Sequence, residues 1–491
     1  MQKHILSKST FIKGLQCTKA LYFHKHRKEL RDDVSAAQEA IFAQGTSIGE
    51  LACELFPGGV DCTPENYFDF QKAVIRTQEE IEKGTKVIYE AAFQFNGVLA
   101  ALDILVKHED GWRAYEVKSS TKVSETYELD ASIQYYCITN SGIDLKDIFI
   151  VHINNQYVKN GPIDVHQLFT LESVRERVSN HLAKIPNQVN HLKNILKQDQ
   201  EPVVDIGPHC NSPYRCDFSG HCWKHIPEYS AFNIARLRAN KKFDLYDKDA
   251  LSFHDIPDDY PLNENQWMQV NSELNKESFI DQEAIQKFVG ELNYPIYHLD
   301  FETFASPVPV FDGSRPYQQM VFQYSLHIEH KAGQLDHREY LAEVNGEDPR
   351  IKFIEQMISD CGDSGDVLVY NIGFERGKLF DLIEFSPKHK LPILKIIDRL
   401  KDLMVPFRDR MYYTPSMQGS YSIKKVLPAL VPELSYKMLN IQEGGTASNT
   451  FSQMVQGNFK GYAVQTRKDL LAYCKMDTYA MVRILEVLKR V

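Results

Sequence analysis

Two acidic residues inside a hydrophobic run place the strongest constraint on this chain. Residues 297–304 read YHLDFETF, so Asp300 and Glu302 alternate with apolar neighbours. Successive side chains of a β-strand point to opposite faces, so both carboxylates would point the same way. Burying an unpaired carboxylate is costly. The pattern therefore predicts either a strand that offers two carboxylates to a cation or an edge strand with a solvated acidic face.

Length and charge narrow the classes of protein. A chain of 491 residues predicts two to four domains, each able to bury its own core. No run of about 18 apolar residues occurs, and the first residues lack the apolar core of a signal peptide. We therefore expect a cytoplasmic protein without a membrane segment. The net charge of −10 excludes a globally basic surface, so nucleic-acid binding would need a local groove or metal ions.

Strand patterns dominate residues 86–151. Segments 87–93, 97–106 and 112–118 are β-rich and separated by turn residues, and a helix over 128–140 and a strand over 148–151 follow. Glu116 and Lys118 share one face of their strand, and the hairpin brings Asp103 close to them. Two acids and a lysine suit metal-assisted phosphodiester hydrolysis. A surface ion pair would explain the same spacing.

These residues resemble the PD-(D/E)XK nuclease superfamily, with Asp103, Glu116 and Lys118 at the D…ExK positions. The resemblance implies that the two carboxylates hold Mg²⁺ or Mn²⁺ and that the lysine positions the attacking water or offsets phosphate charge. Glu90 and Gln134 match the upstream acid and the helix glutamine of that superfamily.

The cysteines point to a bound metal group. Cys210, Cys216 and Cys222 form C-x5-C-x5-C, and Cys17 supplies a fourth thiol, enough for a 4Fe-4S cluster or tetrahedral zinc. One cysteine before the nuclease core and three after it resembles the iron-sulfur RecB-like nucleases. The resemblance implies a 4Fe-4S cluster that joins the ends of the domain, with Zn²⁺ as the alternative. We interpret the other cysteines as packing residues: Cys53, Cys62, Cys137, Cys361 and Cys474.

This resemblance covers residues 1–225, with two departures. Gly49 stands where those nucleases often carry histidine, and Ile138 where their helix motif has tyrosine. We predict a helix over 36–56 and a long amphipathic helix over 165–198, kinked at Pro186. Residues 226–292 are polar, with helical patterns and proline breakers, which predicts a helical connector.

The C-terminal half brings further acids toward the opening strand. We predict strands over 322–328 and 338–341, a helix over 349–360 and a buried strand over 367–370. Glu375 follows that last strand. On a helix over 466–489, Tyr473 and Asp477 share one face with apolar residues. An aspartate in an inward apolar stripe predicts a metal or another cationic partner.

In order, these motifs resemble the DEDD exonucleases of the RNase H-like fold, the DnaQ group. D-x-E stands at Asp300 and Glu302, N-x3-acid ends at Glu375, and Y-x3-D spans Tyr473 and Asp477. The resemblance implies a domain over 293–491 whose four acids hold two Mg²⁺ or Mn²⁺ ions, while the tyrosine orients the attacking water. Glu375 departs from the usual aspartate.

Together the patterns predict an α/β protein with two nuclease-like modules, a pairing similar to a bacterial family of unknown function. We expect metal-dependent hydrolysis of DNA, 3′ to 5′ from single-stranded ends, in repair, recombination or defence. Lys424 lies between the second and third motifs, where it could contact phosphate. Two alternatives stay open: a nucleic-acid-binding or scaffold protein without turnover, and an exonuclease acting on RNA.

Overall fold

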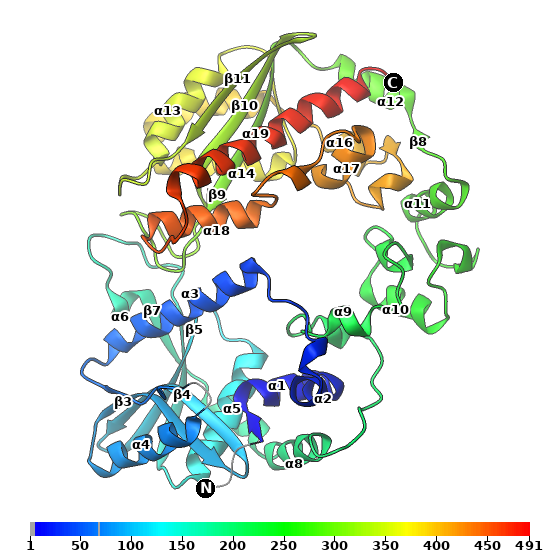
Figure 1. The fold of residues 1–491 in the computed structure, drawn as a ribbon. Helices are drawn as coiled ribbons and strands as arrows, with labels where there is room; N and C mark the ends of the chain where they lie inside the picture. The colour runs from blue at the N-terminus through cyan, green and yellow to red at the C-terminus, as the bar shows by residue number, and fades with distance from the viewer. Residues whose placement is uncertain (1–4, 67–68) are drawn as a thin grey trace. The chain divides into compact units, whose positions relative to one another are not determined.

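The computed structural model describes residues 5–66 and 69–491, and the chain divides into two compact units. The N-terminal unit runs to His225 and includes the loop Pro307–Tyr317. The C-terminal unit comprises Ile226–Ser306 and Gln318–Val491, so the segment predicted as a connector groups with it. Each unit is α/β, with helices packed on a mixed sheet (Figure 1). Within the described ranges, no helix is long and apolar enough to span a membrane.

The sheet of the N-terminal unit has the order β2-β3-β4-β5-β6-β7, with β1 paired to β4. The strands are β1 Leu6–Ser7, β2 Val60–Asp61, β3 Val87–Phe95, β4 Val98–His108, β5 Gly111–Lys118, β6 Leu145–Ile153 and β7 Phe169–Ser173. β3, β4 and β5 are antiparallel, whereas β5 and β6 are parallel. Asn96 and Gly97 connect β3 to β4 with φ of 46° and 74°, the left-handed pair that favours a tight hairpin.

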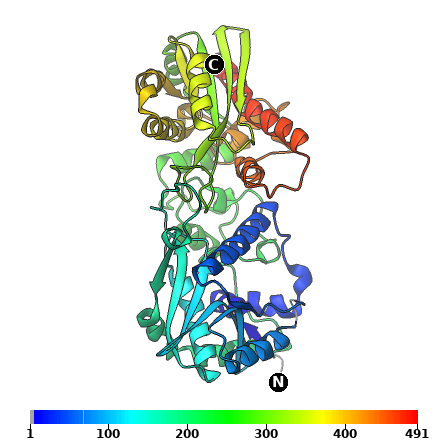
Figure 2. The same ribbon diagram turned by 90° about the vertical axis from the view of Figure 1, so that its left-hand side faces the viewer.

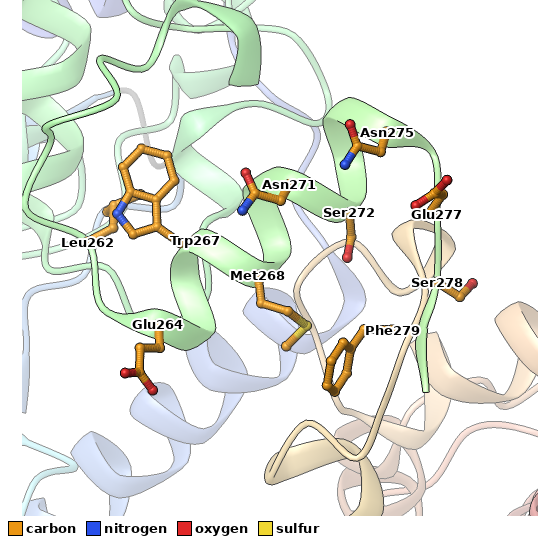
Figure 3. Close-up of a pocket in the computed structure, with 10 residues that line it drawn as sticks. All are labelled: Leu262, Glu264, Trp267, Met268, Asn271, Ser272, Asn275, Glu277, Ser278 and Phe279. Atoms are coloured by element: carbon orange, nitrogen blue, oxygen red, sulfur yellow. The ribbon is translucent and has the colours of Figure 1, made fainter. Parts of the chain in front are cut away.

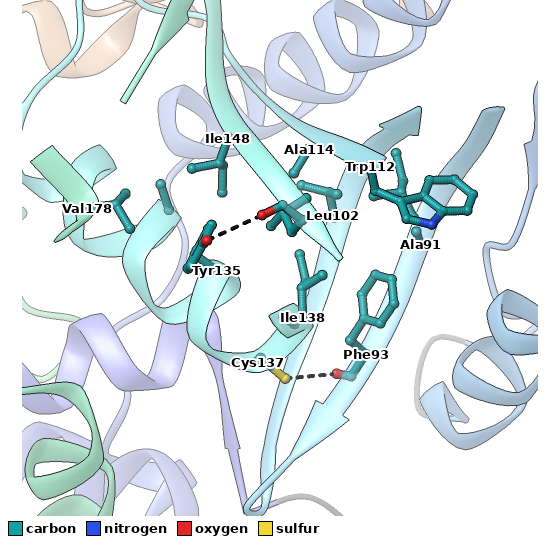
Figure 4. Close-up of a cluster of buried hydrophobic side chains, with 14 of the residues drawn as sticks. Ala91, Phe93, Leu102, Trp112, Ala114, Tyr135, Cys137, Ile138, Ile148 and Val178 are labelled. Carbon is teal, nitrogen blue, oxygen red and sulfur yellow. Dashed lines mark hydrogen bonds between the residues drawn. The ribbon is translucent and has the colours of Figure 1, made fainter. Parts of the chain in front are cut away.

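Helices cover both faces of this sheet. They are α1 Lys8–Gln16, α2 Thr18–His26, α3 Ala36–Ala52, α4 Phe70–Glu82, α5 Glu125–Asn140, α6 Val165–Leu168, α7 Arg175–Leu182, α8 Ile185–Ile195 and α9 Ser219–Cys222. Apolar residues of α5 and of β3 to β6 form one core, and α3 packs against the opposite face. Tyr135 of α5 donates a hydrogen bond to the carbonyl of Leu145. Cys137 of α5 donates one to the carbonyl of Phe93, as Figure 4 shows. These contacts hold α5 against the sheet.

The long helix predicted over 165–198 is wrong. The segment contains α6, the strand β7 and two further helices, α7 and α8. β7 forms because its backbone pairs antiparallel with β6, from Phe169 opposite Ile153 to Ser173 opposite Phe149. Pro186 lies in the first turn of α8, where its missing N–H has no cost, so it begins a helix rather than bending one.

The sheet of the C-terminal unit has the order β11-β10-β9-β12-β13. The strands are β9 Ile296–Phe304, β10 Met320–Lys331, β11 Gln334–Leu341, β12 Asp366–Val369 and β13 Leu400–Asp402, and β8 Phe279–Ile280 pairs separately with β14 Tyr412–Tyr413. β9 is central, antiparallel to β10 and parallel to β12. The edge-strand interpretation of residues 297–304 is therefore wrong.

The helices of this unit are α10 Ala239–Asp247, α11 Glu264–Asn275, α12 Gln282–Gly290, α13 Arg350–Cys361, α14 Ile372–Phe385, α15 Lys390–Asp398, α16 Val405–Arg408, α17 Ile423–Leu430, α18 Gly444–Val455 and α19 Ala463–Leu488. Leu299 and Phe301 of β9 belong to an apolar core with α13, α14 and α15. α19, drawn in red, lies across the opposite face of β9 and β10 (Figures 1 and 2). Asp300 and Glu302 point toward this helix because they alternate with the core residues.

Candidate functional site

The predicted acids of the C-terminal unit converge between β9 and α19. Glu302 and Asp477 are 8% and 7% exposed, although both are ionisable groups. Tyr436 donates a hydrogen bond of 2.6 Å from Oη to Asp477 Oδ1. Tyr473, one helical turn before Asp477, is also buried. β9 and α19 therefore hold two carboxylates and a tyrosine that are far apart in sequence on one buried surface.

Burial and mutual repulsion raise the pKa of these carboxyl groups. For Asp300, burial is the largest cause of a strongly raised pKa, followed by the charges of Asp477 and Glu302. Burial and Asp477 likewise raise the pKa of Glu302. The pKa of Asp477 rises to about 6 through burial, although Tyr436 opposes the shift. Such a cluster keeps protons unless a cation replaces them.

Glu375 supplies a fourth acid from the first turn of α14. It is 2% exposed, and its Oε2 atom has no hydrogen-bond partner. Burial raises its pKa to about 8. α14 starts directly after β12 through Asn371, whose left-handed φ of 91° makes the sharp change of direction. A buried carboxylate oxygen without a donor needs an explanation, and a bound cation would provide one.

Asp402, at the end of β13, is an acid that sequence reasoning missed. Its Oδ1 accepts backbone hydrogen bonds from Asn371 at 3.1 Å and Met404 at 3.0 Å. Its charge also contributes to the raised pKa of Glu375. No motif could have identified it, because β13 has only three residues and its position depends on parallel pairing with β12.

Cys474, predicted as a packing residue, lies inside the acidic cluster. Asp300, Glu302 and Cys474 offer ligand atoms that all lie within 4.8 Å of one another, the one such group of three in residues 5–66 and 69–491. Cys474 Sγ is 3.7 Å from Asp300 Oδ2. Its place next to Tyr473 and three residues before Asp477 puts it on the inward stripe, a signal that the sequence did contain.

Lys424 is a cation beside these acids. Its Nζ lies 5.5 Å and 5.3 Å from the ring centroids of Tyr436 and Tyr473, and it donates to the carbonyl of Gln442. The lysine charge lowers the pKa of both Glu302 and Asp477, in opposition to their burial. It therefore offsets only part of the cluster's charge.

The predicted residues of the N-terminal unit also meet. Pairing of Ile104 with Tyr115 sets Asp103 opposite Glu116 across β4 and β5. Asp103 Oδ2 accepts a hydrogen bond from the backbone N–H of Val117 at 2.6 Å. Lys118 Nζ lies 2.7 Å from Glu116 Oε1 and 2.7 Å from Oδ2 of Asp130 on α5. The lysine thus bridges two acids, one of which the sequence analysis did not identify.

A second lysine reaches the same carboxylate. Lys8, the first residue of α1, places Nζ 2.6 Å from Glu116 Oε1. Burial alone would raise the pKa of Glu116, but Lys118 and Lys8 outweigh it and hold the pKa at about 2. Burial and the charge of Glu116 raise the pKa of Asp103 to about 7. Here lysine ammonium groups already compensate an ionised carboxylate, unlike the C-terminal cluster.

Two further matches to the nuclease pattern differ in placement. Gln134 of α5 is fully buried four residues after Asp130, and neither atom of its amide has a hydrogen-bond partner. Glu90 lies in β3 between residues that pair with Leu102 and Ile104, and its side chain is exposed. Gln134 therefore lies on the α5 face that carries Asp130, and its amide atoms lack hydrogen-bond partners. Glu90 lies at the edge of the group formed by Asp103, Glu116 and Lys118.

The four predicted ligand cysteines line one small cavity. Cys17 caps the start of α2, Cys210 is buried in a short 3-10 turn, Cys216 precedes α9 and Cys222 is its last residue. Phe218 closes the cavity from the apolar side. Folding thus brings together thiols separated by almost the whole N-terminal unit.

A further pocket lies away from these residues. It has a volume of about 570 Å³, runs along α11 and is lined by Trp267, Met268 and Phe279 among others (Figure 3). None of the predicted site residues lines it. The pocket therefore adds no chemistry to either acidic centre.

Part of the chain is similar to known proteins. Residues 297–422 match a family model described as a domain of unknown function, DUF2779. The uncharacterized protein UU173 of Ureaplasma parvum is 27% identical over 243 residues, 44% of this chain and 34% of its own length. The uncharacterized MG366 homolog of Mycoplasma pneumoniae is 29% identical over 208 residues, 38% of this chain and 31% of its own length. The chain spans about a third of the length of the curated relatives it matches.

The Lys8–Glu116 contact predicts a pH-dependent loss of stability. Lys8→Ala removes one of two ammonium partners from a buried carboxylate and should lower the free energy of unfolding by about 1–3 kcal/mol near neutral pH. The stabilisation belongs to ionised Glu116, whose pKa lies at about 2, below the ordinary value. It is present above about pH 4 and is lost as pH falls toward 2. Urea unfolding of both proteins at several pH values measures it.

Lys72→Ala is the matched control, because Lys72 pairs with Asp69 on the surface and its side chain is 78% exposed. It should change stability little at any pH. Equal effects of the two substitutions would contradict the assigned role of Lys8.

Because the C-terminal acids have raised pKa values, we predict that a divalent ion stabilises the folded protein more at higher pH. Their pKa values are raised in the folded state, so a repulsion penalty accumulates as pH rises from about 4 to about 8. A bound ion removes this penalty. Mn²⁺ should therefore raise the thermal midpoint more near pH 8 than near pH 6, as calorimetry would measure. Asp300→Asn should reduce the shift at both pH values, and an equal shift at both in the wild type would refute the prediction.

Proposed function

We propose that this chain is a cytoplasmic, metal-dependent nuclease whose C-terminal unit hydrolyses DNA from single-stranded 3′ ends. The observation that carries the proposal is the convergence of Asp300, Glu302, Asp477 and the unpartnered Glu375, all with raised pKa values. Acidic oxygen ligands of this kind suit Mg²⁺ or Mn²⁺. Repair, recombination or defence against foreign DNA is the setting we expect.

The arrangement also supports an RNase H-like, DEDD-type assignment for this unit. The first two acids lie on the central strand, the third follows the neighbouring parallel strand, and Asp477 lies on the helix across the sheet. This is the order that the resemblance to the DnaQ group implies. By the same reasoning, the meeting of Asp103, Glu116 and Lys118 supports a PD-(D/E)XK core in the N-terminal unit.

The residues present fit a two-metal reaction. Divalent ions, when bound by these acids, supply charge stabilisation at the phosphate that is attacked and at the leaving oxygen. Tyr473 Oη orients the attacking water by hydrogen bonding. Lys424 contacts a phosphate oxygen, since its charge already reaches Glu302 and Asp477. Gly444, which starts α18, lies next to these groups: a Cβ atom there would be 3.7 Å from both Glu302 Oε2 and Tyr473 Oη.

The N-terminal unit has a different role in this proposal. Lys8 and Lys118 both contact Glu116 Oε1 and already compensate its charge, although its buried Oε2 has no partner. A divalent ion at this carboxylate would therefore compete with two ammonium groups. This favours a module that grips DNA over a second centre of equal activity. The unused amide of Gln134 supports a polar ligand at this position.

The thiol cavity supports a 4Fe-4S cluster over zinc. Tetrahedral zinc, with Zn–S bonds of about 2.3 Å, holds its sulfur atoms only about 3.8 Å apart. Among the described residues, the four cysteines contain no set of three whose sulfur atoms all lie within 4.8 Å of one another. Cys17 from the start of the unit and the three cysteines from its end line one cavity, which suits a group that joins the two ends.

The alternatives are a binding protein without turnover and an exonuclease for RNA. Glu375 in place of aspartate and the lysine-filled N-terminal centre favour the first. The intact set of Asp300, Glu302, Tyr473 and Asp477 opposes it. No described contact distinguishes a 2′-hydroxyl from a hydrogen atom.

A degradation assay tests the proposal. With Mn²⁺, the wild type should shorten 5′-labelled single-stranded DNA in steps from the 3′ end. Asp300→Ala should reduce the rate at least about 1,000-fold, because it removes a ligand that both the ground state and the transition state need. Lys118→Ala, run beside it, reports on the N-terminal centre and should retain most of the exonuclease rate.

RNA of the same sequence is the comparison substrate. Faster degradation of RNA would move the assignment to the RNA exonuclease. If the wild type degrades neither DNA nor RNA faster than Asp300→Ala does, only the alternative of a binding protein without turnover remains.

The cluster has its own test. Protein prepared without oxygen should be brown and contain iron and acid-labile sulfide, and Cys216→Ser should lose both. Cys62→Ser, at a buried cysteine outside the cavity, is the matched control and should keep them. Zinc without iron in the wild type would refute the cluster.

A further inference from the structure

Cys474 lies in the C-terminal centre and has no part in the proposed reaction. Its side chain is fully buried, and Sγ lies 3.7 Å from Asp300 Oδ2 and 3.8 Å from the Asp300 carbonyl oxygen. A thiol as a packing residue needs only apolar neighbours, but this one contacts a carboxylate. We propose that Asp300, Glu302 and Cys474 form a site for a thiophilic divalent cation of the Zn²⁺ class, which excludes the ions needed for hydrolysis.

The spacing of the ligand atoms fits such an ion. With Zn–S and Zn–O bonds of about 2.3 and 2.1 Å, a tetrahedral ion separates sulfur from oxygen by about 3.6 Å. The observed separation of 3.7 Å between Cys474 Sγ and Asp300 Oδ2 is close to this value. Glu302 completes a group whose ligand atoms lie within 4.8 Å of one another. Little rearrangement is needed to close three ligands around one ion.

A further acid belongs to the same charge cluster but lies outside the group of three ligand atoms. Glu375 has a buried oxygen without a partner, and its charge contributes to the raised pKa of Asp300. This is a separate observation from the position of the thiol. A cation held by Asp300, Glu302 and Cys474 would occupy both carboxylates of β9, so the ions needed for hydrolysis could not bind them at the same time.

The chemistry of the ligands selects among cations. Mg²⁺ demands oxygen ligands in near-octahedral geometry, so a thiol beside its position contributes nothing to binding. Zn²⁺ and Co²⁺ accept thiolate and carboxylate together and bind such ligands more tightly than Mn²⁺ does. On binding, the cation forms a bond to sulfur, and the thiol proton leaves to solvent. The predicted result is an enzyme that Mn²⁺ activates and traces of Zn²⁺ inhibit.

Co²⁺ is the probe for the first test, because thiolate coordination gives it a charge-transfer absorption band that carboxylates do not give. The full-length chain should show this band on titration, and Cys474→Ser should lose the intensity of one thiolate. Cys17→Ser should keep the absorption intensity that the Cys474 thiolate contributes. This comparison separates Co²⁺ bound at Cys474 from Co²⁺ bound in the other thiol cavity. Cys361→Ser, at another fully buried cysteine of the C-terminal unit, is the matched control for folding.

Zn²⁺ affinity, measured by competition with a chelating dye, is the second test. Cys474→Ser should bind Zn²⁺ at least about tenfold more weakly than the wild type, since even changes outside the ligand shell cost 10–100-fold. Its Mn²⁺ affinity should change much less. Cys474→Ala provides the same comparison if the serine variant does not fold. Equal Co²⁺ bands and equal Zn²⁺ affinities in wild type and variants would overturn the proposal.

Only the inhibitory consequence rests on the proposed nuclease function. If the chain degrades no nucleic acid but loses its Co²⁺ band on Cys474→Ser, the metal site stands and the nuclease assignment fails. If it degrades DNA and the band does not depend on Cys474, the reverse holds.

Discussion

Carboxylates buried between a central strand and the helix that crosses it are the constraint on which the C-terminal unit depends. Asp300 and Glu302 cannot turn away, because the alternate residues Leu299 and Phe301 are fixed in the apolar core on the other face. That core supplies the burial of apolar surface that stabilises the sheet. The α19 face can therefore carry groups that oppose folding until a cation or protons compensate them.

The two acidic centres solve the same electrostatic problem in different ways. In the N-terminal unit, Lys8 and Lys118 lie within hydrogen-bond distance of Glu116, which stays ionised without help from an ion. In the C-terminal unit, Lys424 lies over tyrosine rings and offsets only part of the charge. A divalent ion would thus compete with ammonium groups at the N-terminal centre and with protons at the C-terminal one. This difference in charge compensation is why we propose turnover in the C-terminal unit.

Much of this arrangement could be predicted from the sequence, because strand and helix periods fix which residues share a face. The alternation around Asp300 and the four-residue spacing of Tyr473 and Asp477 are of this kind. Lys8 could not be predicted, since it reaches Glu116 only through the pairing of β1 with β4. The strand over residues 169–173 could not be predicted, because their polar pattern also fits an amphipathic helix. They form a strand because they pair with β6. Cys474 was misread because its neighbour across the interface comes from a distant strand.

The geometry of the C-terminal centre also requires that α19 keep one register on the sheet. Apolar contacts alone would permit α19 to shift along the sheet. Hydrogen bonds between polar groups of α19 and β10 fix its register. Thr478 Oγ1 lies 2.7 Å from Ser325 Oγ and 2.8 Å from His327 Nδ1, both on β10. Gln323 Nε2 donates to the carbonyl of Leu470 at 2.8 Å. Because a shift of one residue would break these buried hydrogen bonds, the polar layer positions Tyr473 and Asp477 opposite the acids of β9.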